Sequence, residues 1–240
     1  MKGDTEVALF ILFFLSGFAV AHMIDSLELV GWLEVIVTSV TTLFAAFLGA
    51  WYAFRLQNKK EAEVLIRNDL KVGNGTIFRL LNLQNRLLNY HAQVLNPVRD
   101  HDALFFRLQP SAPMARDEFT PDIDGLSFLF QKEPNLIGEV HTAISKYAAS
   151  IDAINIRSTL HIDVQRKIEE AGFQQGDDRT WDDLRKIAGE RDFHTLQQLT
   201  DQLVEIVDSS VVYLGETVDK LSYAITEIHP GRLVLCREET

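Results

Sequence analysis

Residues 35–54 read VIVTSVTTLFAAFLGAWYAF, an uncharged and largely apolar stretch that decides the fold of this chain. A helix rises about 1.5 Å per residue, so roughly 20 apolar residues cross the hydrocarbon of a bilayer. Trp32 precedes the stretch, and Trp51 and Tyr52 lie near its end. Aromatic side chains at both ends suit the two membrane interfaces. The stretch therefore predicts a transmembrane helix.

A second apolar stretch, Val7–Ile24, lies upstream and is just long enough to span a bilayer. The two stretches together predict a transmembrane helical hairpin over residues 1–55. The alternative for the first stretch is a signal peptide cleaved after Ala19-Val20-Ala21, which has the small-x-small pattern. Asp4 and Glu6 make its start unusually acidic for a signal peptide. Cleavage leaves the placement of the C-terminal region unchanged, because the second stretch alone anchors it.

Charge sets the predicted orientation. Arg55, Lys59 and Lys60 follow the second stretch, whereas the loop between the two stretches carries acidic residues and no basic one. Lysine and arginine are enriched in the cytosolic flanks of membrane helices. These three residues therefore predict an inner-membrane protein whose region after Phe54 is cytoplasmic.

Small residues recur every four positions along the second stretch, at Thr41, Ala45, Gly49 and Ala53, and the first stretch offers Gly17 and Ala21 as a counterpart. This spacing lets helix backbones approach closely in a membrane. Two interpretations stay open. The row packs the hairpin helices against each other within one chain, or it drives association into a homo-oligomer.

The rest of the chain predicts helices. Apolar residues recur every three or four positions over 77–95, 135–171 and 194–228, as on the buried face of a helix. Gly73-Asn74-Gly75 is a predicted kink or break before the first of these. Three amphipathic helices bury their apolar stripes most economically in an antiparallel bundle. The predicted fold class is therefore all-α, a transmembrane hairpin followed by a cytosolic antiparallel helical bundle.

Finer features divide the chain further. Gln84 interrupts the first stripe, and Asn135 and Thr180 are predicted helix caps. The predicted division is a hairpin at 1–55, a membrane-proximal helix and first bundle helix at 56–97, a Pro-containing loop and short helix at 98–134, the remaining bundle at 135–231, and a tail at 232–240.

Composition and motifs argue against several functions. Residues 55–240 carry 22 basic and 29 acidic side chains, which argues against a broad nucleic-acid surface. Cys236 is the only cysteine, so there is no disulfide framework. Asp100-His101-Asp102 is the one acid–histidine cluster, and three adjacent loop residues are typical of solvated surface rather than a metal site. The sequence predicts no catalytic residue, no metal and no cofactor.

Three segments carry a resemblance: NLQNRLLNYHAQVLNP at 82–97, DGLSFLF at 124–130 and EPNLIGEVHTAISKYAASIDAINIRSTLH at 133–161. With the hairpin, they resemble uncharacterised bacterial inner-membrane proteins that have a two-helix anchor and a helical cytosolic domain. The resemblance covers most of residues 30–165. In layout alone, the chain is also similar to two-transmembrane, membrane-damaging effectors of antiphage systems, including some retrons.

These observations lead to one function hypothesis with two alternatives. The first is a non-enzymatic protein in a lipid bilayer whose cytosolic helices sense or dock a protein partner and couple it to the hairpin; a toxin-like antiviral effector is one form. The second is a structural scaffold that recruits a cytosolic complex. The third is a membrane-bound enzyme with a site near Asp100-His101-Asp102 or His91.

Overall fold

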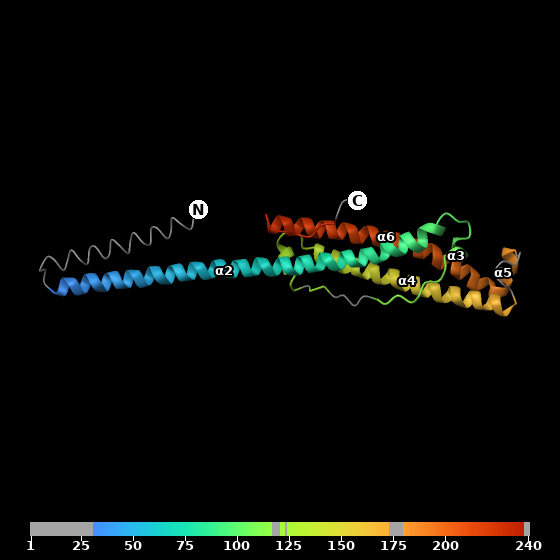
Figure 1. Ribbon diagram of the computed structural model, residues 1–240, viewed down its shortest axis with the longest axis horizontal. Coiled ribbons are helices and arrows are strands. Elements are labelled where there is room, and N and C mark those ends of the chain that lie inside the picture. The colour runs from blue at the N-terminus through green and yellow to red at the C-terminus, as the bar shows by residue number, and fades with distance from the viewer. Residues whose placement is uncertain (1–30, 117–120, 123, 173–179, 238–240) are drawn as a thin grey trace. The chain divides into compact units, whose positions relative to one another are not determined.

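The computed structural model describes residues 31–116, 121–122, 124–172 and 180–237. Every regular element within these ranges is a helix, which confirms the all-α class (Figure 1). Contacts divide the chain into an N-terminal unit, Met1–Leu65, and a C-terminal unit, Ile66–Thr240. The first predicted membrane stretch, with Gly17 and Ala21, lies outside the described residues. The hairpin therefore stays a prediction.

Helix α2 runs without interruption from Gly31 to Tyr90 and crosses the boundary between the two units. The predicted break at Gly73-Asn74-Gly75 is therefore wrong. Gly73 is buried against Ile225 of α6 (Glu190–Ile228), and a Cβ at this position would lie 2.5 Å from Cδ1 of Ile225. A glycine in a helix costs about 1 kcal/mol. Contact with a neighbouring helix outweighs that cost here, because tertiary packing supplies most of the stability of protein helices.

The chain leaves α2 through a short π-helical turn, η1 (His91–Leu95), a 3₁₀ turn, η2 (Asn96–Val98), and the four-residue helix α3 (Leu104–Arg107). The segment after α3 contains Pro110 and Pro113, which cannot donate helical hydrogen bonds. It lies along α4 (Leu136–Glu170) instead of forming a helix. The N–H of Ser111 donates to Oγ of Ser158 (3.1 Å), and the side chain of Asn155 exchanges two hydrogen bonds of 2.9 Å with the backbone of Met114.

The remaining elements are the 3₁₀ turn η3 (Ser127–Gln131), α4, the short helix α5 (Trp181–Ala188) and α6. Helices α4 and α6 are antiparallel, because Glu139 near the start of α4 pairs with Lys220 near the end of α6 (2.8 Å). At the opposite ends of the two helices, Lys167 pairs with Asp192.

Helix α2 is also antiparallel to α6. Oδ2 of Asp69 on α2 lies 3.2 Å from Nε2 of His229, directly after the end of α6. Later on α2 and earlier on α6, Nε2 of Gln84 donates to the carbonyl of Val211 (3.1 Å). Since α2 and α4 both oppose α6, they run parallel to each other. The expectation of antiparallel neighbours throughout is wrong, because the segment after α3 carries the chain back along α4 (Figure 1).

One apolar core joins the three long helices of the C-terminal unit. Its fully buried members include Ile77, Leu80, Leu87, Val140, Ile151, Ile154, Leu203, Val207, Leu214, Val218, Leu221 and Ile225. Leu83 is also buried, whereas Leu88, another leucine of the apolar pattern over 77–95, is 39% exposed. Two polar pairs lie inside: Gln84 with the carbonyl of Val211, and Oγ of Ser150 with Oγ of Ser210 (2.9 Å). Their partners explain why polar residues occupy core positions.

The caps follow local sequence closely. Thr180 forms a capping box with Asp183 at the start of α5, as predicted. Asn135 precedes α4 as expected, but its side chain makes no capping hydrogen bond, because its own backbone is already helical. Helix α6 ends at Ile228, directly before His229-Pro230-Gly231, where Gly231 has a φ of 78°.

Two glycines two positions apart, Gly73 and Gly75, give a matched test of the contact between α2 and α6. A Cβ at Gly75 meets no atom within 4 Å, whereas a Cβ at Gly73 meets the buried Ile225 side chain. We expect Gly75→Ala to raise the free energy of unfolding by about 1 kcal/mol through helix propensity. Gly73→Ala should not raise the free energy of unfolding, because its new methyl group would clash with Ile225, and overpacking of this kind costs about 1–3 kcal/mol. Chemical denaturation measures both, and an equal rise in the two variants would contradict the close approach.

Candidate functional site

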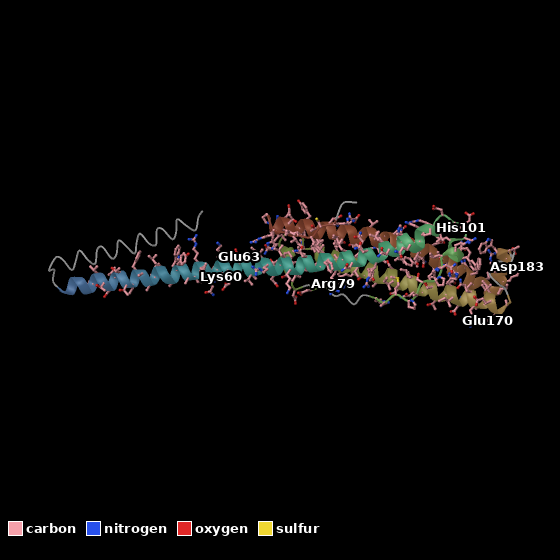
Figure 2. The ribbon with its side chains drawn as sticks, viewed as in Figure 1. Lys60, Glu63, Arg79, His101, Glu170 and Asp183 are labelled. Carbon is pink, nitrogen blue, oxygen red and sulfur yellow. The ribbon has the colours of Figure 1, made fainter. Side chains whose placement is uncertain are left out.

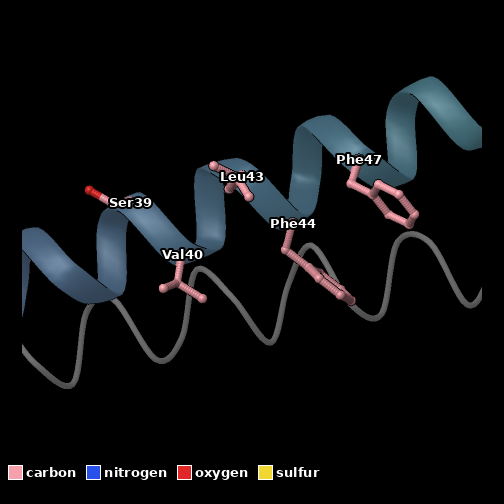
Figure 3. Close-up of a pocket in the computed structure, with 5 residues that line it drawn as sticks. All are labelled: Ser39, Val40, Leu43, Phe44 and Phe47. Atoms are coloured by element: carbon pink, nitrogen blue, oxygen red, sulfur yellow. The ribbon is translucent and has the colours of Figure 1, made fainter.

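The apolar part of α2 has the length and composition of a membrane span. Among the described residues, one helix is long and apolar enough to cross a bilayer. Its large side chains are exposed, with Leu43 at 76%. Val40, Leu43, Phe44 and Phe47 line an open apolar hollow of about 350 Å³ with Ser39 (Figure 3). Exposed apolar side chains in this number fit a hydrocarbon environment better than water.

The predicted row of small residues lies on the exposed surface of this segment. Thr41, Ala45, Gly49 and Ala53 are all exposed, and a Cβ at Gly49 meets no atom within 4 Å. The hydroxyl of Thr41 donates to the carbonyl of Val37 within the same helix (2.7 Å). That bond satisfies the hydroxyl in an apolar surrounding. Space for a close helix neighbour is therefore present, and both interpretations of the row remain open.

The predicted basic flank follows directly. Arg55, Lys59 and Lys60 are exposed on α2 (Figure 2 labels Lys60). The guanidinium of Arg55 lies 5.5 Å from the centre of the Trp51 ring, within the range of a cation–π contact. An arginine beside a tryptophan is the combination found where a membrane helix meets the headgroups. This Arg55–Trp51 pair lies at the end of the apolar part of the segment.

The acid–histidine cluster at residues 100–102 lies between η2 and α3. His101 lies toward the end of the C-terminal unit that also carries Glu170 and Asp183 (Figure 2). The N–H of Ala103 donates to Nδ1 of His101 (3.3 Å), so one ring nitrogen is already used. Within the described ranges, no three His, Cys, Asp or Glu side chains converge as metal ligands would. The cluster is a turn between η2 and α3.

His91 belongs to a small polar group that ties the π-helical turn to α6. Its Nε2 lies 3.0 Å from Nη1 of Arg99 and 3.1 Å from Oδ1 of Asp208, and Arg99 also pairs with Asp208. Arginine can only donate, so a bond from Arg99 requires a lone pair on Nε2, whereas a bond to Asp208 requires a proton there. The neutral ring can serve either partner, one at a time. All three side chains are partly exposed, so this group is a surface anchor for the turn.

Arg157 is the largest fully buried side chain in the described structure. Its Nη2 donates to the carbonyl of Phe105 (2.7 Å), its Nη1 to the carbonyl of Gln109 (3.4 Å) and its Nε to Oγ1 of Thr200 (3.3 Å). Burial lowers the pKa of Arg157 to about 10, so the side chain stays charged at neutral pH. Arg157 therefore fixes α3 and the chain after it onto α4 and α6 through neutral oxygens.

His161 lies one turn beyond Arg157 and is also fully buried. Neither ring nitrogen has a hydrogen-bond partner of normal geometry. Burial lowers the pKa of His161 to about 4, the positive charge of Arg157 adds to the lowering, and the backbone of Leu108 opposes it. His161 is thus a neutral core residue at neutral pH, and the Phe106 ring lies 5.8 Å from its own.

Aromatic rings close this end of the C-terminal unit. Phe105 lies 5.0 Å from Phe193 and 5.8 Å from Trp181, measured between ring centres, and Phe106 lies 5.7 Å from Trp181. These distances suit edge-to-face and tilted packing. Trp181 opens α5 and Phe193 lies in the first turn of α6, so the rings attach α5 to α3 and α6 over His161.

Sequence reasoning missed Arg157 and His161, although a signal was present. Both lie on the stripe that joins Ile154 to Val164 at steps of three and four residues. A polar residue at a core position of a stripe indicates either an exposed interruption of the stripe or a buried polar group. The contact that shows Arg157 to be buried comes from α3 and the residues after it, which lie about fifty residues earlier in the chain, so the local sequence does not reveal it.

Comparison with known proteins adds no relative. No protein-family model, no curated protein and no solved structure matches this chain at a significant level.

Acid should weaken the C-terminal unit through His161. Its pKa is about 4 when folded and 6.5 in the unfolded chain. As pH falls from 6.5 to 4, only the unfolded chain gains this proton, so the free energy of unfolding falls. We expect His161→Leu to reduce that fall by about 2–3 kcal/mol, which corresponds to about two pKa units. The exposed His141→Leu variant is the control, and denaturation at pH 7 and pH 4.5 gives the comparison; identical falls in both variants would refute this role.

Proposed function

We propose that this chain is a non-enzymatic inner-membrane protein whose C-terminal helical unit docks a cytosolic protein partner and couples it to the transmembrane hairpin. One observation carries the proposal. The single helix α2 supplies both an exposed apolar segment of membrane-spanning length and a core stripe of the C-terminal unit.

Continuity of α2 gives the coupling a physical basis. Residues 55–65 are exposed around the whole helix and lie between the apolar segment and the buried stripe. An α-helix has a fixed rise and rotation per residue, so an intact helix passes an axial shift or rotation along its length. Small helix shifts of this kind are a common form of conformational switching. A partner that moves α2 against α4 and α6 would therefore act on the membrane segment.

Charge supports the cytoplasmic placement. Arg55, Lys59 and Lys60 follow the apolar segment, and Trp51 lies beside Arg55 as an interfacial pair. Each basic side chain near an anionic bilayer surface contributes about 1 kcal/mol of attraction.

Self-association in the membrane is the second part of the proposal. The exposed row from Thr41 to Ala53 leaves room for a helix from another copy. In the effector form, assembled copies permeabilise the inner membrane as part of an antiviral defence. The scaffold alternative keeps the anchor and the partner but leaves the membrane intact.

The lone cysteine gives a direct test of topology. Cys236 is exposed in the C-terminal unit. We expect a membrane-impermeant maleimide to label Cys236 in inverted inner-membrane vesicles and in detergent, but not in intact spheroplasts. A Cys236→Ser variant, which has no cysteine, controls for background. Labelling in intact spheroplasts would place the C-terminal unit outside and refute the proposed orientation.

Assembly can be tested at Gly49. Gly49→Leu fills the small-residue row and should reduce oligomer size in lipid nanodiscs, because it holds neighbouring helices apart. Phe47→Leu, outside the row, is the control and should leave size unchanged.

Induced expression with a potential-sensitive dye separates the effector form from the scaffold. Wild type and Phe47→Leu should depolarise the membrane when the neighbouring genes are present, and Gly49→Leu should not. Unchanged nanodisc size for Gly49→Leu would refute assembly through the row, and an unaffected potential in the wild type would refute the effector form.

A further inference from the structure

The residues after α6 fold back against α2 and α6, and we call the surface that they cover the groove. Helix α6 ends at Ile228, and Gly231 has a φ of 78°, a conformation that glycine adopts readily. The chain beyond this turn, residues 232–237, is not helical. We call these residues the C-terminal segment. They make specific contacts with both helices, whereas the sequence predicts only a tail over residues 232–240.

Asn74 of α2 binds the backbone of the C-terminal segment. Its Nδ2 donates to the carbonyl of Leu233 (3.3 Å), and its Oδ1 accepts from the N–H of Leu235 (2.9 Å). One side-chain amide thus pairs with an extended backbone as a neighbouring strand would. Between these two positions, Val234 packs against the apolar core, while Leu233 is 88% exposed.

At the other end of the C-terminal segment, Arg237 binds α6. Nη2 of Arg237 donates to Oδ2 of Asp219 on α6 (2.8 Å). Gly215, one turn earlier on α6, leaves the space that the Arg237 guanidinium and the amide of Gln84 fill; a Cβ there would collide with both. The groove therefore accepts an extended backbone, an apolar side chain, and an arginine three positions later.

These contacts are of the kinds by which proteins bind peptides, and each of them is weak. The hydrogen bonds and the ion pair lie at exposed positions, where each contributes little stability. The segment also forms no part of the helices, so it can leave without unfolding them. Recognition of an extended backbone by hydrogen bonds, with pockets for particular side chains, is a common way to bind peptides.

We propose that this groove is the partner-docking site, and that a partner's extended segment with an apolar residue three positions before an arginine displaces the C-terminal segment from it. The inference rests on the proposed docking function. It places the partner directly on α2, the helix that continues into the apolar segment. The C-terminal segment then acts as a built-in competitor that keeps the groove closed until the partner arrives.

A nitroxide on Cys236, the only cysteine, reports whether the C-terminal segment is bound in the full-length chain in nanodiscs. We expect a largely immobile spectrum for the wild type. Asn74→Ala should convert most of the signal to the mobile form, and Asn68→Ala, at an exposed asparagine on the same helix, should not. Asp219→Arg should also release the segment, and Arg237→Asp in the same chain should restore it. This charge exchange keeps the test valid if Asn74→Ala perturbs folding.

Displacement is then measured with a synthetic peptide of residues 231–237 carrying Cys236→Ser. The C-terminal segment is part of the same chain, so it competes with the added peptide at an effective concentration of about 1 mM. The peptide is therefore added to the Arg237→Gln variant, whose own C-terminal segment binds the groove more weakly. Peptide at about 10 mM, tenfold above that concentration, should free at least half of the immobile label. A peptide with Arg237→Glu should leave it bound.

A wild-type label as mobile as that of Asn74→Ala, or an acceptor spectrum unchanged by peptide, would overturn the proposal. Either result would leave the membrane topology and assembly measurements untouched, so failure of the groove is distinguishable from failure of the proposed function.

Discussion

Burial of one stripe of α2 against α4 and α6 is the constraint on which the rest of the structure depends. Ile77, Leu80, Leu83 and Leu87 are at most 2% exposed. Burying a side chain of this size contributes roughly 1.5–3 kcal/mol. The same helix carries the apolar segment, so the residues that hold the C-terminal unit together and those suited to the bilayer share one backbone. This shared helix is why docking and membrane activity belong in one proposal.

Local patterns in the sequence predicted much of the fold. The stripes of α4 and α6, the Thr180 cap and the end of α6 at Ile228 follow from spacing and capping chemistry. The parallel course of α2 and α4 does not, because it depends on where the segment after α3 binds along α4. Gly73 shows the same limit. The low helix propensity of glycine favours a break in the helix at this position. The helix continues because Gly73 packs against Ile225, which lies 152 residues later in the chain.

The candidate sites also fall into two groups, those that local sequence predicted and those that depend on distant segments of the chain. Residue type and position along the chain were enough to predict an apolar stretch of spanning length and its basic flank, because both are local signals. The buried Arg157 and the Asn74 groove were missed, because each depends on backbone atoms from distant segments. Arg157 stabilises the end that holds α3 and α5, whereas Asn74 lies on α2 near the first turns of the C-terminal unit. The two polar features therefore have different consequences: one is structural, and the other faces an exchangeable segment.

The central claim is that α2 is one helix from the apolar segment into the core. Hydrogen exchange of the amides from residue 55 to residue 72, in the full-length chain in nanodiscs, tests it most directly. An intact helix predicts amides that exchange at least about tenfold slower than in an unfolded chain through the whole range, including Leu65 and Ile66, where the two units meet. A run of amides near residues 62–68 that exchange at unfolded rates, with protected amides on both sides, would contradict the account.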